Sequence, residues 1–372
     1  MTLTGKTIVD LTRGELDRLP PPIFIEAASR ALLARTNGYT DTAGLPALRD
    51  RLADFASAKF GMPVRREQLA VTAGAKPALY HALRAILDPG DEVIVPTPYW
   101  TTFPEQVRLA GGIPVFVDLS QSGYAFSAAA FASAISDRTK AIILNSPHNP
   151  TGQCISDKEL AGLVTLADRC GAYILFDQCY QDLIYPMHRG SRLGETLGSF
   201  GHAVVIDSFS KPWALTGWRI GYVCADPAII RAITAIQTHT TSNPSSIAQY
   251  ALLSTLDHGG AEEYVAAVRQ DLADRCVWVA EAFAGIALVS VALPQAGFFI
   301  FVDVRRLLDL SPGASIDALC EDLLRECDVL VVPGTAFGEP GGFRLSFGGN
   351  EAAVRDGVGR VAGFLRDLQS RG

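Results

Sequence analysis

Residues 141–177, AIILNSPHNPTGQCISDKELAGLVTLADRCGAYILFD, decide the fold class of this chain. Two short apolar runs, Ala141–Asn145 and Ala172–Asp177, flank a segment over Asp157–Cys170 in which apolar residues recur at helical spacing. A helix between two strands is typical of parallel β-sheets, because parallel neighbours need a long crossover connection. The stretch therefore predicts a strand–helix–strand unit of an α/β protein.

The same rhythm continues on both sides of this unit. Further apolar runs lie at 91–96 (DEVIVP), 113–117 (IPVFV), 203–207 (AVVID) and 219–224 (RIGYVC), with longer segments of helical spacing between them. We therefore expect a central sheet of mainly parallel strands with helices on both faces. Ligands of such sheets gather at the carboxyl ends of the strands, so the polar residues that follow these runs are candidates for a functional site.

The pattern after the sheet predicts a second, smaller α+β domain. A long amphipathic pattern over 261–285 leads out of the larger domain. The elements of the smaller domain are expected at 297–303, 329–332 and 343–347 for strands and at 351–368 for a closing helix. We assign 36–282 to the large domain and 1–35 with 283–372 to the small one, since the proline-rich N-terminal segment is expected to fold back onto it.

Composition narrows the class of protein. The chain has 372 residues, 48% of them hydrophobic, and a formal net charge of −7, which indicates no general attraction to nucleic acid or anionic membranes. The N-terminus lacks the basic and apolar regions of a signal peptide, and no run of about 18 apolar residues is present, so we expect a cytoplasmic protein without a membrane span. Seven cysteines without a CxxC pair indicate reduced thiols, and we expect no metal site.

The segment SFSKPWALTGWRIGY, residues 208–222, carries the most informative chemistry. The amine of Lys211 can form an imine with an aldehyde cofactor, and a partly desolvated, cation-rich pocket lowers the pKa of such an amine so that it can also move protons. Ser208, Ser210 and Arg219 are candidates for holding a phosphate, the hydroxyls by hydrogen bonds and the guanidinium by a bidentate charged pair. The alternative interpretation of Lys211 is a solvated lysine on a loop.

This segment resembles the cofactor-lysine signature of the class I/II aminotransferases, which are pyridoxal-phosphate enzymes of fold type I. The resemblance covers nearly the whole chain, because further family motifs follow in the expected order. They are AGLPALR at 43, AGAKPAL at 73, PYW at 98, NSPHNPTG at 145, DQCY at 177 and FRLSF at 343. Within the family, the motifs are most similar to those of bacterial aspartate aminotransferases, including YWTTFPE at 99–105.

The resemblance implies roles for the cofactor residues. Asp177 is similar to the carboxylate that pairs with the pyridine nitrogen and makes the ring an electron sink, and with Lys211 and Tyr180 it forms the expected catalytic set. Tyr180 and Asn149 resemble the two donors to the phenolic oxygen, and Trp100 resembles the aromatic residue that stacks on the ring. Taken singly, Asp177 also suits a helix N-cap, Asn149 a turn and Trp100 a hydrophobic core.

Two further groups are expected at the cofactor phosphate. Gly74, Ala75 and Lys76 open a predicted helix, and the free amides at a helix N-terminus suit a phosphate. By resemblance, Tyr39 reaches the phosphate of a neighbouring subunit, and the stretch 241–243 does likewise. A homodimer with shared active sites is therefore expected.

On the substrate side, Arg344 resembles the family arginine that grips the α-carboxylate, a task suited to a planar fork of donors. Gly14 matches the glycine whose backbone approaches the same carboxylate, and Trp100 and Asn149 are also expected to contact substrate. In the bacterial subgroup, a lysine at the place of Lys76 is associated with the distal carboxylate of acidic substrates, which favours aspartate, glutamate or 2-oxoglutarate. The alternative interpretations are a surface arginine on a strand for Arg344 and a solvated lysine for Lys76.

The expected activity is the transfer of an amino group between an L-amino acid and a 2-oxo acid. Two departures from the family pattern, RGELD at 13–17 and DQCY in place of DEIY, fall near the substrate. Elimination, cyclisation or oxidation with the same cofactor is therefore the alternative. A ligand-sensing regulator would need a DNA-binding module, which this acidic chain does not indicate, and the presence of Lys211, Asp177 and Arg219 disfavours an inactive scaffold.

Overall fold

The computed structural model describes residues 7–34, 36–310 and 313–371, and its larger unit is built on a seven-stranded sheet of order β2–β8–β7–β6–β5–β3–β4. The strands are β2 (Leu69–Thr72), β3 (Glu92–Thr97), β4 (Ile113–Asp118), β5 (Thr139–Asn145), β6 (Tyr173–Asp177), β7 (Ala203–Ser208) and β8 (Gly221–Cys224). Neighbours from β7 to β4 are parallel, whereas β8 is antiparallel to both β7 and β2. The predicted α/β class with a mainly parallel sheet is confirmed.

Two strands of this seven-stranded sheet differ from the sequence-based prediction. The strand expected from residue 219 begins at Gly221 instead, because Arg219 has a left-handed backbone (φ 52°) and cannot continue an extended chain. Strand β2 was not predicted from the sequence. It is only four residues long, and its three consecutive apolar residues, Leu69 to Val71, make too short a run to indicate a strand.

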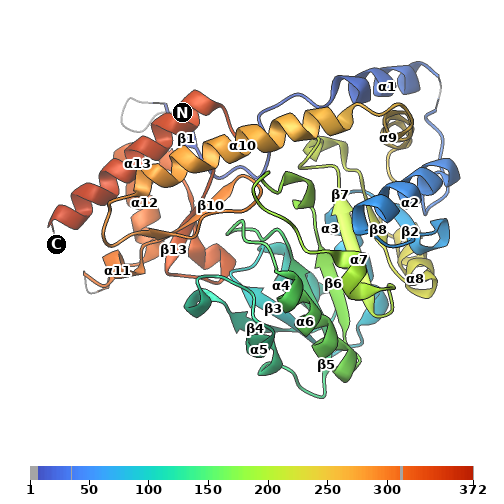
Figure 1. The fold of residues 1–372 in the computed structure, drawn as a ribbon, viewed down its shortest axis with the longest axis horizontal. Helices are drawn as coiled ribbons and strands as arrows, with labels where there is room; N and C mark the ends of the chain where they lie inside the picture. Colours follow the sequence, from blue (N-terminus) through green and yellow to red (C-terminus); the bar gives the residue numbers. More distant parts are fainter. Residues whose placement is uncertain (1–6, 35, 311–312, 372) are drawn as a thin grey trace.

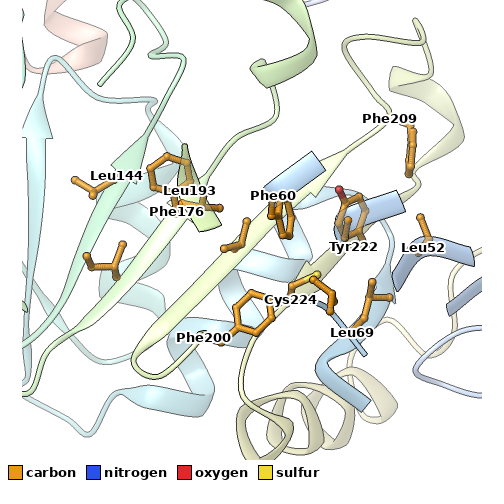
Figure 2. Packing of buried hydrophobic residues seen from close by; sticks show 14 of the residues in the cluster. Leu52, Phe60, Leu69, Leu144, Phe176, Leu193, Phe200, Phe209, Tyr222 and Cys224 are labelled. Carbon is orange, nitrogen blue, oxygen red and sulfur yellow. The ribbon is translucent and has the colours of Figure 1, made fainter. Parts of the chain in front are cut away.

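Helices cover both faces of this sheet because alternate side chains of each strand point to opposite faces. Ile142 and Leu144 of β5 pack with helices α1 (Pro22–Leu33), α2 (Pro46–Phe60), α6 (Asp157–Cys170) and α9 (Ser246–His258). Figure 2 shows part of this layer, including Phe60 of α2 beside Tyr222 and Cys224 of β8. Ile143 lies on the other face with α3 (Ala75–Ile86), α4 (Thr102–Leu109) and α8 (Pro227–Thr238), while α5 (Ala128–Ala132) and α7 (Leu193–Leu197) are shorter and pack with α6.

The smaller unit lies at one end of the molecule, and the long helix α10 (Ala261–Phe283) extends from it toward α9 of the larger unit (Figure 1). Its sheet has the order β12–β13–β10–β9, and a separate parallel pair joins β1 to β11. The elements are β1 (Val9–Asp10), β9 (Ser290–Val291), β10 (Phe299–Asp303), β11 (Val329–Leu330), β12 (Val332–Pro333), β13 (Gly342–Ser346), α11 (Arg305–Leu308), α12 (Ile316–Cys327) and α13 (Glu351–Arg371). The strand predicted at 329–332 is therefore divided between two sheets.

The domain boundaries remain predictions, and the N-terminal segment divides between the two units. Strand β1 pairs with β11, so this part of the N-terminal segment contacts the smaller unit, as expected. Helix α1 differs from the expectation, because Phe24, Ala27 and Ala28 are buried in the core of the larger sheet, where the helix packs on α9. An apolar helical face packs where it can bury most surface, and α9 offers that surface.

Within the described ranges, no helix is long and apolar enough to cross a membrane. Over the same ranges, no group of three or more His, Cys, Asp or Glu residues is gathered as metal ligands would be.

Candidate active site

A cavity of about 520 Å³ lies at the carboxyl ends of β5, β6 and β7, beside β10 and β13 of the smaller unit. Parallel strands end at the same edge of a sheet, so the residues that follow them converge there. Predicted site residues that line the cavity are Gly14, Ala75, Lys76, Trp100, Asn149, Asp177, Tyr180, Ser208, Ser210, Lys211, Arg219 and Arg344. Segments from seven separate parts of the sequence thus meet at one place.

Lys211 lies in the turn that follows β7, with its Nζ in the cavity. This ammonium donates a short hydrogen bond to the carbonyl oxygen of Gly14 and lies 6.0 Å from the centre of the Tyr180 ring. Burial lowers the pKa of Lys211, and the positive charges of Arg344 and Arg219 lower it further, although the neighbouring Cys179 acts in the opposite direction. The amine is therefore easier to deprotonate than a solvated lysine, as a nucleophile or proton carrier requires.

The first turn of α3 and the side chain of Arg219 form one wall of the cavity. Gly74 precedes the helix with φ 89° and ψ 176°, a conformation that is essentially restricted to glycine. A Cβ atom at this position would lie only 2.6 Å from Nη2 of Arg219. Arg219 is itself held by a 2.8 Å hydrogen bond from Nη1 to the carbonyl of Thr216. With the buried Ser208 and Ser210 nearby, this wall offers helix amides, a guanidinium and hydroxyls, which is a donor set suited to a phosphate.

Asp177 ends β6 and is buried, and its side chain faces the same cavity. Burial raises the pKa of its carboxyl group, while the adjacent side chain of Cys179, the hydrogen bond from the Cys179 amide to Oδ1 at 3.1 Å and the charge of Lys211 lower it. The adjacent loop is fixed by Asn145 at the end of β5. Its Nδ2 donates to the Asp177 carbonyl at 3.1 Å and its Oδ1 accepts from the Asn149 amide at 2.8 Å.

Arg344 projects from β13 into the opposite side of the cavity. Its Nη1 donates to Oδ1 of Asn149 at 3.1 Å and its Nη2 donates to the Thr12 carbonyl at 2.7 Å. The guanidinium lies against the rings of Phe299 and Phe337, 4.2 and 5.0 Å from their centres. Its Nε is buried and has no hydrogen-bond partner among the described residues. Burial lowers the pKa of Arg344 to about 10. A buried cation with an unused donor is suited to a carboxylate ligand.

Two aromatic side chains complete the cavity walls. Tyr180 is buried edge-on against Phe298 and Phe299, and this burial raises the pKa of its hydroxyl, which therefore acts as a neutral donor. Trp100 precedes α4, and the Nζ of Lys76 lies 5.0 Å from the centre of its ring. An ammonium so close to a ring face gains cation–π stabilisation, which keeps Lys76 beside the cavity.

A buried charge cluster lies directly behind the cavity wall. Nζ of Lys59, in the last turn of α2, contacts Oδ2 of Asp207 at 2.6 Å and Oδ2 of Asp182 at 2.7 Å. Asp207 precedes Ser208 in β7, accepts from the Ser208 amide at 2.7 Å and accepts from the Tyr222 hydroxyl at 2.9 Å. The cluster thus anchors the end of β7 from which Lys211 follows.

Three of the predictions fall outside the cavity lining. Gly74 lies behind Arg219 rather than on the cavity surface. Tyr39 is 93% exposed in the single chain, and the stretch 241–243 is also absent from the lining. The roles of Tyr39 and of this stretch at a partner's site therefore remain predictions.

The sequence analysis missed several lining residues, which are Thr101, Asn145, Cys179, Thr216, Phe299, Val332 and Phe337. Thr101, Asn145, Cys179 and Thr216 stand within motifs quoted above, so their position along the chain was a usable signal. Phe299, Val332 and Phe337 reach the cavity only because the smaller unit packs over the sheet edge. No local pattern marks them.

Fold and site together define an α/β enzyme with a reactive lysine, a buried carboxylate and an anion-binding wall in one cavity. A profile of the family described as aminotransferase class I and II matches residues 6–361. The chain belongs to this family, whose members depend on pyridoxal phosphate, and it is an aminotransferase, as its motifs predicted.

Individual relatives agree with this assignment. The chain is 36% identical to aspartate aminotransferase of Geobacillus stearothermophilus, over 97% of this chain and 92% of the relative. Identity and coverage are the same for the aspartate/prephenate aminotransferase of Thermus thermophilus. Among solved structures, it superposes on aspartate aminotransferase of Thermus thermophilus with maleate with a TM-score of 0.90, at 36% identity, over 96% of this chain and 92% of that one. The expected fold type is thereby confirmed.

Proposed function

We propose that this aminotransferase acts on acidic substrates, moving the amino group of aspartate or glutamate to a 2-oxo acid, with pyridoxal phosphate attached to Lys211. The observation that carries the proposal is the position of Lys211 in a single cavity between Asp177 and Arg344, with a lowered pKa. The names of the relatives support the acidic substrate, because several are described as aspartate aminotransferases.

The residues present fit pyridoxal phosphate. Its phosphate suits the wall made by Arg219, the serine hydroxyls and the start of α3, where a side chain at position 74 would displace the guanidinium. Its pyridine nitrogen suits the buried carboxylate of Asp177. Its phenolic oxygen suits the hydroxyl of Tyr180 and the side-chain amide of Asn149. When bound, the cofactor supplies an electron sink for the charge left after the α-proton of an amino acid is removed.

The residues of this chain have separate roles in the proposed reaction. Arg344 binds the α-carboxylate of the substrate, using its fork and the unused Nε donor. As a neutral amine, Lys211 would take the α-proton at Nζ, and its lowered pKa makes the neutral form more accessible than in a solvated lysine. Phe299 and Phe337, packed on the guanidinium of Arg344, exclude water from the carboxylate and strengthen the charged contact.

Lys76 is the proposed partner of the distal carboxylate of the substrate. It lines the cavity beside Trp100. Among the described residues that line the cavity, only Asp177 has an acidic side chain. Lys76→Met should raise KM for aspartate by about tenfold or more, since hydrogen bonds to charged groups contribute roughly 1.5–3 kcal/mol. KM for alanine, which lacks the second carboxylate, should change little. An equal effect on both donors would contradict the assignment.

A homodimer with shared sites is also proposed. Large apolar side chains are exposed on α1 and just beyond it, at Leu32, Leu33 and Tyr39. An exposed apolar surface of this kind favours a protein partner, and a second copy of the chain would bring Tyr39 to the neighbouring site. The chain has a mass of 39.7 kDa, and sedimentation should therefore give twice this value. Tyr39→Phe should weaken cofactor binding without changing the sedimenting mass.

Visible absorbance of the pyridoxal-phosphate-loaded protein provides the test of the reaction. Titration with aspartate or glutamate should remove the absorbance band of the lysine-bound cofactor, and addition of a 2-oxo acid should restore it. Lys211→Ala should still bind the cofactor but show no such cycle. Wild-type turnover in that variant would refute the role of Lys211, and a band that does not return with any 2-oxo acid would favour the elimination, cyclisation or oxidation alternatives.

A further inference from the structure

Tyr124 is a buried tyrosine with a strained backbone, and it has no part in the steps above. It follows β4 and the turn at 120–122 in the larger unit, and it is 3% exposed. Its φ of 68° lies in the left-handed region, which is uncommon for so large a side chain. Such a conformation persists only where the surrounding contacts determine it, and residues of this kind cluster at functional sites. The contacts of Tyr124 therefore indicate its role.

The hydroxyl of Tyr124 forms two hydrogen bonds to the smaller unit. It donates to Oδ2 of Asp303, at the end of β10, at 3.1 Å, and it accepts from Nη2 of Arg305, at the start of α11, at 3.1 Å. Arg305 also contacts Glu339, with 3.3 Å between Nη2 and Oε1. Burial, followed by the negative charges of Asp303 and Glu339, raises the pKa of the Tyr124 hydroxyl, which therefore keeps the proton that it donates. A side chain of the larger unit is thus tied, directly or through Arg305, to three charged residues of the smaller unit.

The ring of Tyr124 packs on the same unit, next to the cavity wall. It meets Phe301 of β10 edge-on, with 5.3 Å between the ring centres, and Tyr124, Phe301 and Phe337 form one buried apolar cluster. Phe337 lines the cavity, and so does Val332, which packs against this cluster. The ring centre of Phe337 lies 5.0 Å from Cζ of Arg344. Tyr124 therefore belongs to the cluster that holds the side chain covering Arg344.

The segment that carries Phe337 is fixed to the larger unit at a second point. The Tyr99 amide, which belongs to the larger unit, donates to the carbonyl of Phe337 at 3.0 Å. Glu339, two residues further on, accepts from Arg305, which in turn donates to the Tyr124 hydroxyl. The Tyr99 amide and the Tyr124 hydroxyl thus hold the segment 334–339 at two points.

We propose that Tyr124 is a positioning residue, which holds Phe337 against Arg344 and thereby favours binding of the substrate carboxylate. The inference rests on the proposed function, because it concerns the guanidinium assigned to that carboxylate. A guanidinium from which water is excluded binds a carboxylate more strongly, so the apparent affinity for substrate should follow the fraction of molecules in which Phe337 is in place. The proposed cofactor residues, such as Asp177 and Lys211, belong to the larger unit, so cofactor affinity should not depend on this tie.

The first test separates substrate binding from cofactor binding. Tyr124→Phe keeps the ring but removes the hydroxyl, while the 2.9 Å ion pair between Nε of Arg305 and Oδ2 of Asp303 does not involve that hydroxyl. KM for aspartate should rise by about threefold or more, since one hydrogen bond shifts an equilibrium by roughly two- to tenfold. The dissociation constant of pyridoxal phosphate, measured by equilibrium dialysis, should equal that of the wild type. An unchanged KM would overturn the inference, and so would an equal loss of cofactor affinity, which indicates a merely structural role.

Tyr264→Phe is the matched control. The Tyr264 hydroxyl donates to the Leu19 carbonyl at 2.8 Å, and neither residue lines the cavity, so this variant loses a tyrosine hydrogen bond elsewhere and should keep the wild-type KM. An equal rise of KM in the two variants would overturn the inference.

A double-mutant cycle tests the route through Phe337. Tyr124→Phe should raise KM less in a Phe337→Leu background than in the wild type, because the two side chains act in sequence. The same factor in both backgrounds would show that Tyr124 does not act through Phe337, and would overturn the inference.

A further measurement needs no turnover. Hydrogen exchange of the pyridoxal-phosphate-loaded proteins, followed by mass spectrometry over peptides that cover 334–341, should be several-fold faster in Tyr124→Phe than in the wild type, because this segment has lost one of its ties. Exchange in α6 should not change. Equal exchange at 334–341 would overturn the inference even if KM differed. Absence of wild-type turnover with aspartate and glutamate would instead mean failure of the proposed function, so the two failures are distinguishable.

Discussion

Replacement of Lys59 by methionine should destabilise this protein more at high pH than at low pH. The Lys59 ammonium lies within 2.7 Å of two carboxylates, and its side chain is 10% exposed, compared with 3% for Asp207 and 27% for Asp182. Methionine fills a similar volume but leaves both carboxylates without their cation. Breaking a buried ion pair by removing one partner costs about 3–5 kcal/mol.

The geometry favours the lower end of that range, about 3 kcal/mol at pH 8. Asp207 keeps its hydrogen bonds from the Ser208 amide and the Tyr222 hydroxyl, and Asp182 can be partly solvated. Burial raises the pKa of Asp207 to about 6 although Lys59 opposes the shift, so the variant should raise it further. A carboxyl group with a raised folded-state pKa binds its proton more tightly when folded, and the resulting stability is present at low pH and lost as pH rises through that pKa.

Urea unfolding of the cofactor-free proteins, followed by tryptophan fluorescence at pH 8 and pH 5.5, measures the effect. The matched set is Lys59→Met, Asp207→Asn and the double variant. A neutral amide at position 207 needs no cation, so the double variant should be more stable than Lys59→Met alone. A loss below about 1 kcal/mol at pH 8, in the range typical of exposed pairs, would refute this account. So would a loss that does not shrink at pH 5.5.

Two further predictions concern the cavity. Gly74→Ala should raise the dissociation constant of pyridoxal phosphate by at least about tenfold, because the backbone strain alone costs roughly 1–3 kcal/mol and the new Cβ displaces Arg219. Equilibrium dialysis checks this against Gly359→Ala, where an added Cβ meets nothing within 4 Å, and equal affinities would contradict it. Arg344→Lys keeps the charge but loses the fork that also contacts Asn149, so steady-state KM for the amino donor should rise by about tenfold or more at unchanged cofactor affinity. An unchanged KM would remove Arg344 from carboxylate binding.

The fold class could be predicted from the chain because its signals are local. Apolar runs such as 141–145 and 172–177 alternate with helical spacing, and each pattern depends only on near neighbours in the sequence. Strand β2 was not predicted, because its apolar run of Leu69, Ala70 and Val71 is too short to indicate a strand. The placement of α1 was also missed, because it depends on α9, more than 200 residues away along the chain.

In the candidate site, too, some features could be predicted from the sequence and others depend on the tertiary structure. The sequence alone determined the chemical groups, since Lys211, Asp177 and Arg344 stand in motifs whose residue types match one chemistry. Only the tertiary structure decided their neighbours. The pairing of Ser208 with Cys179 and the packing of Phe299 on Arg344 arise between strands or units that no local pattern connects. Burial, which sets the pKa values of Lys211 and Asp177, is likewise a property of the packed molecule, because removal of water requires segments distant in sequence to close around a group.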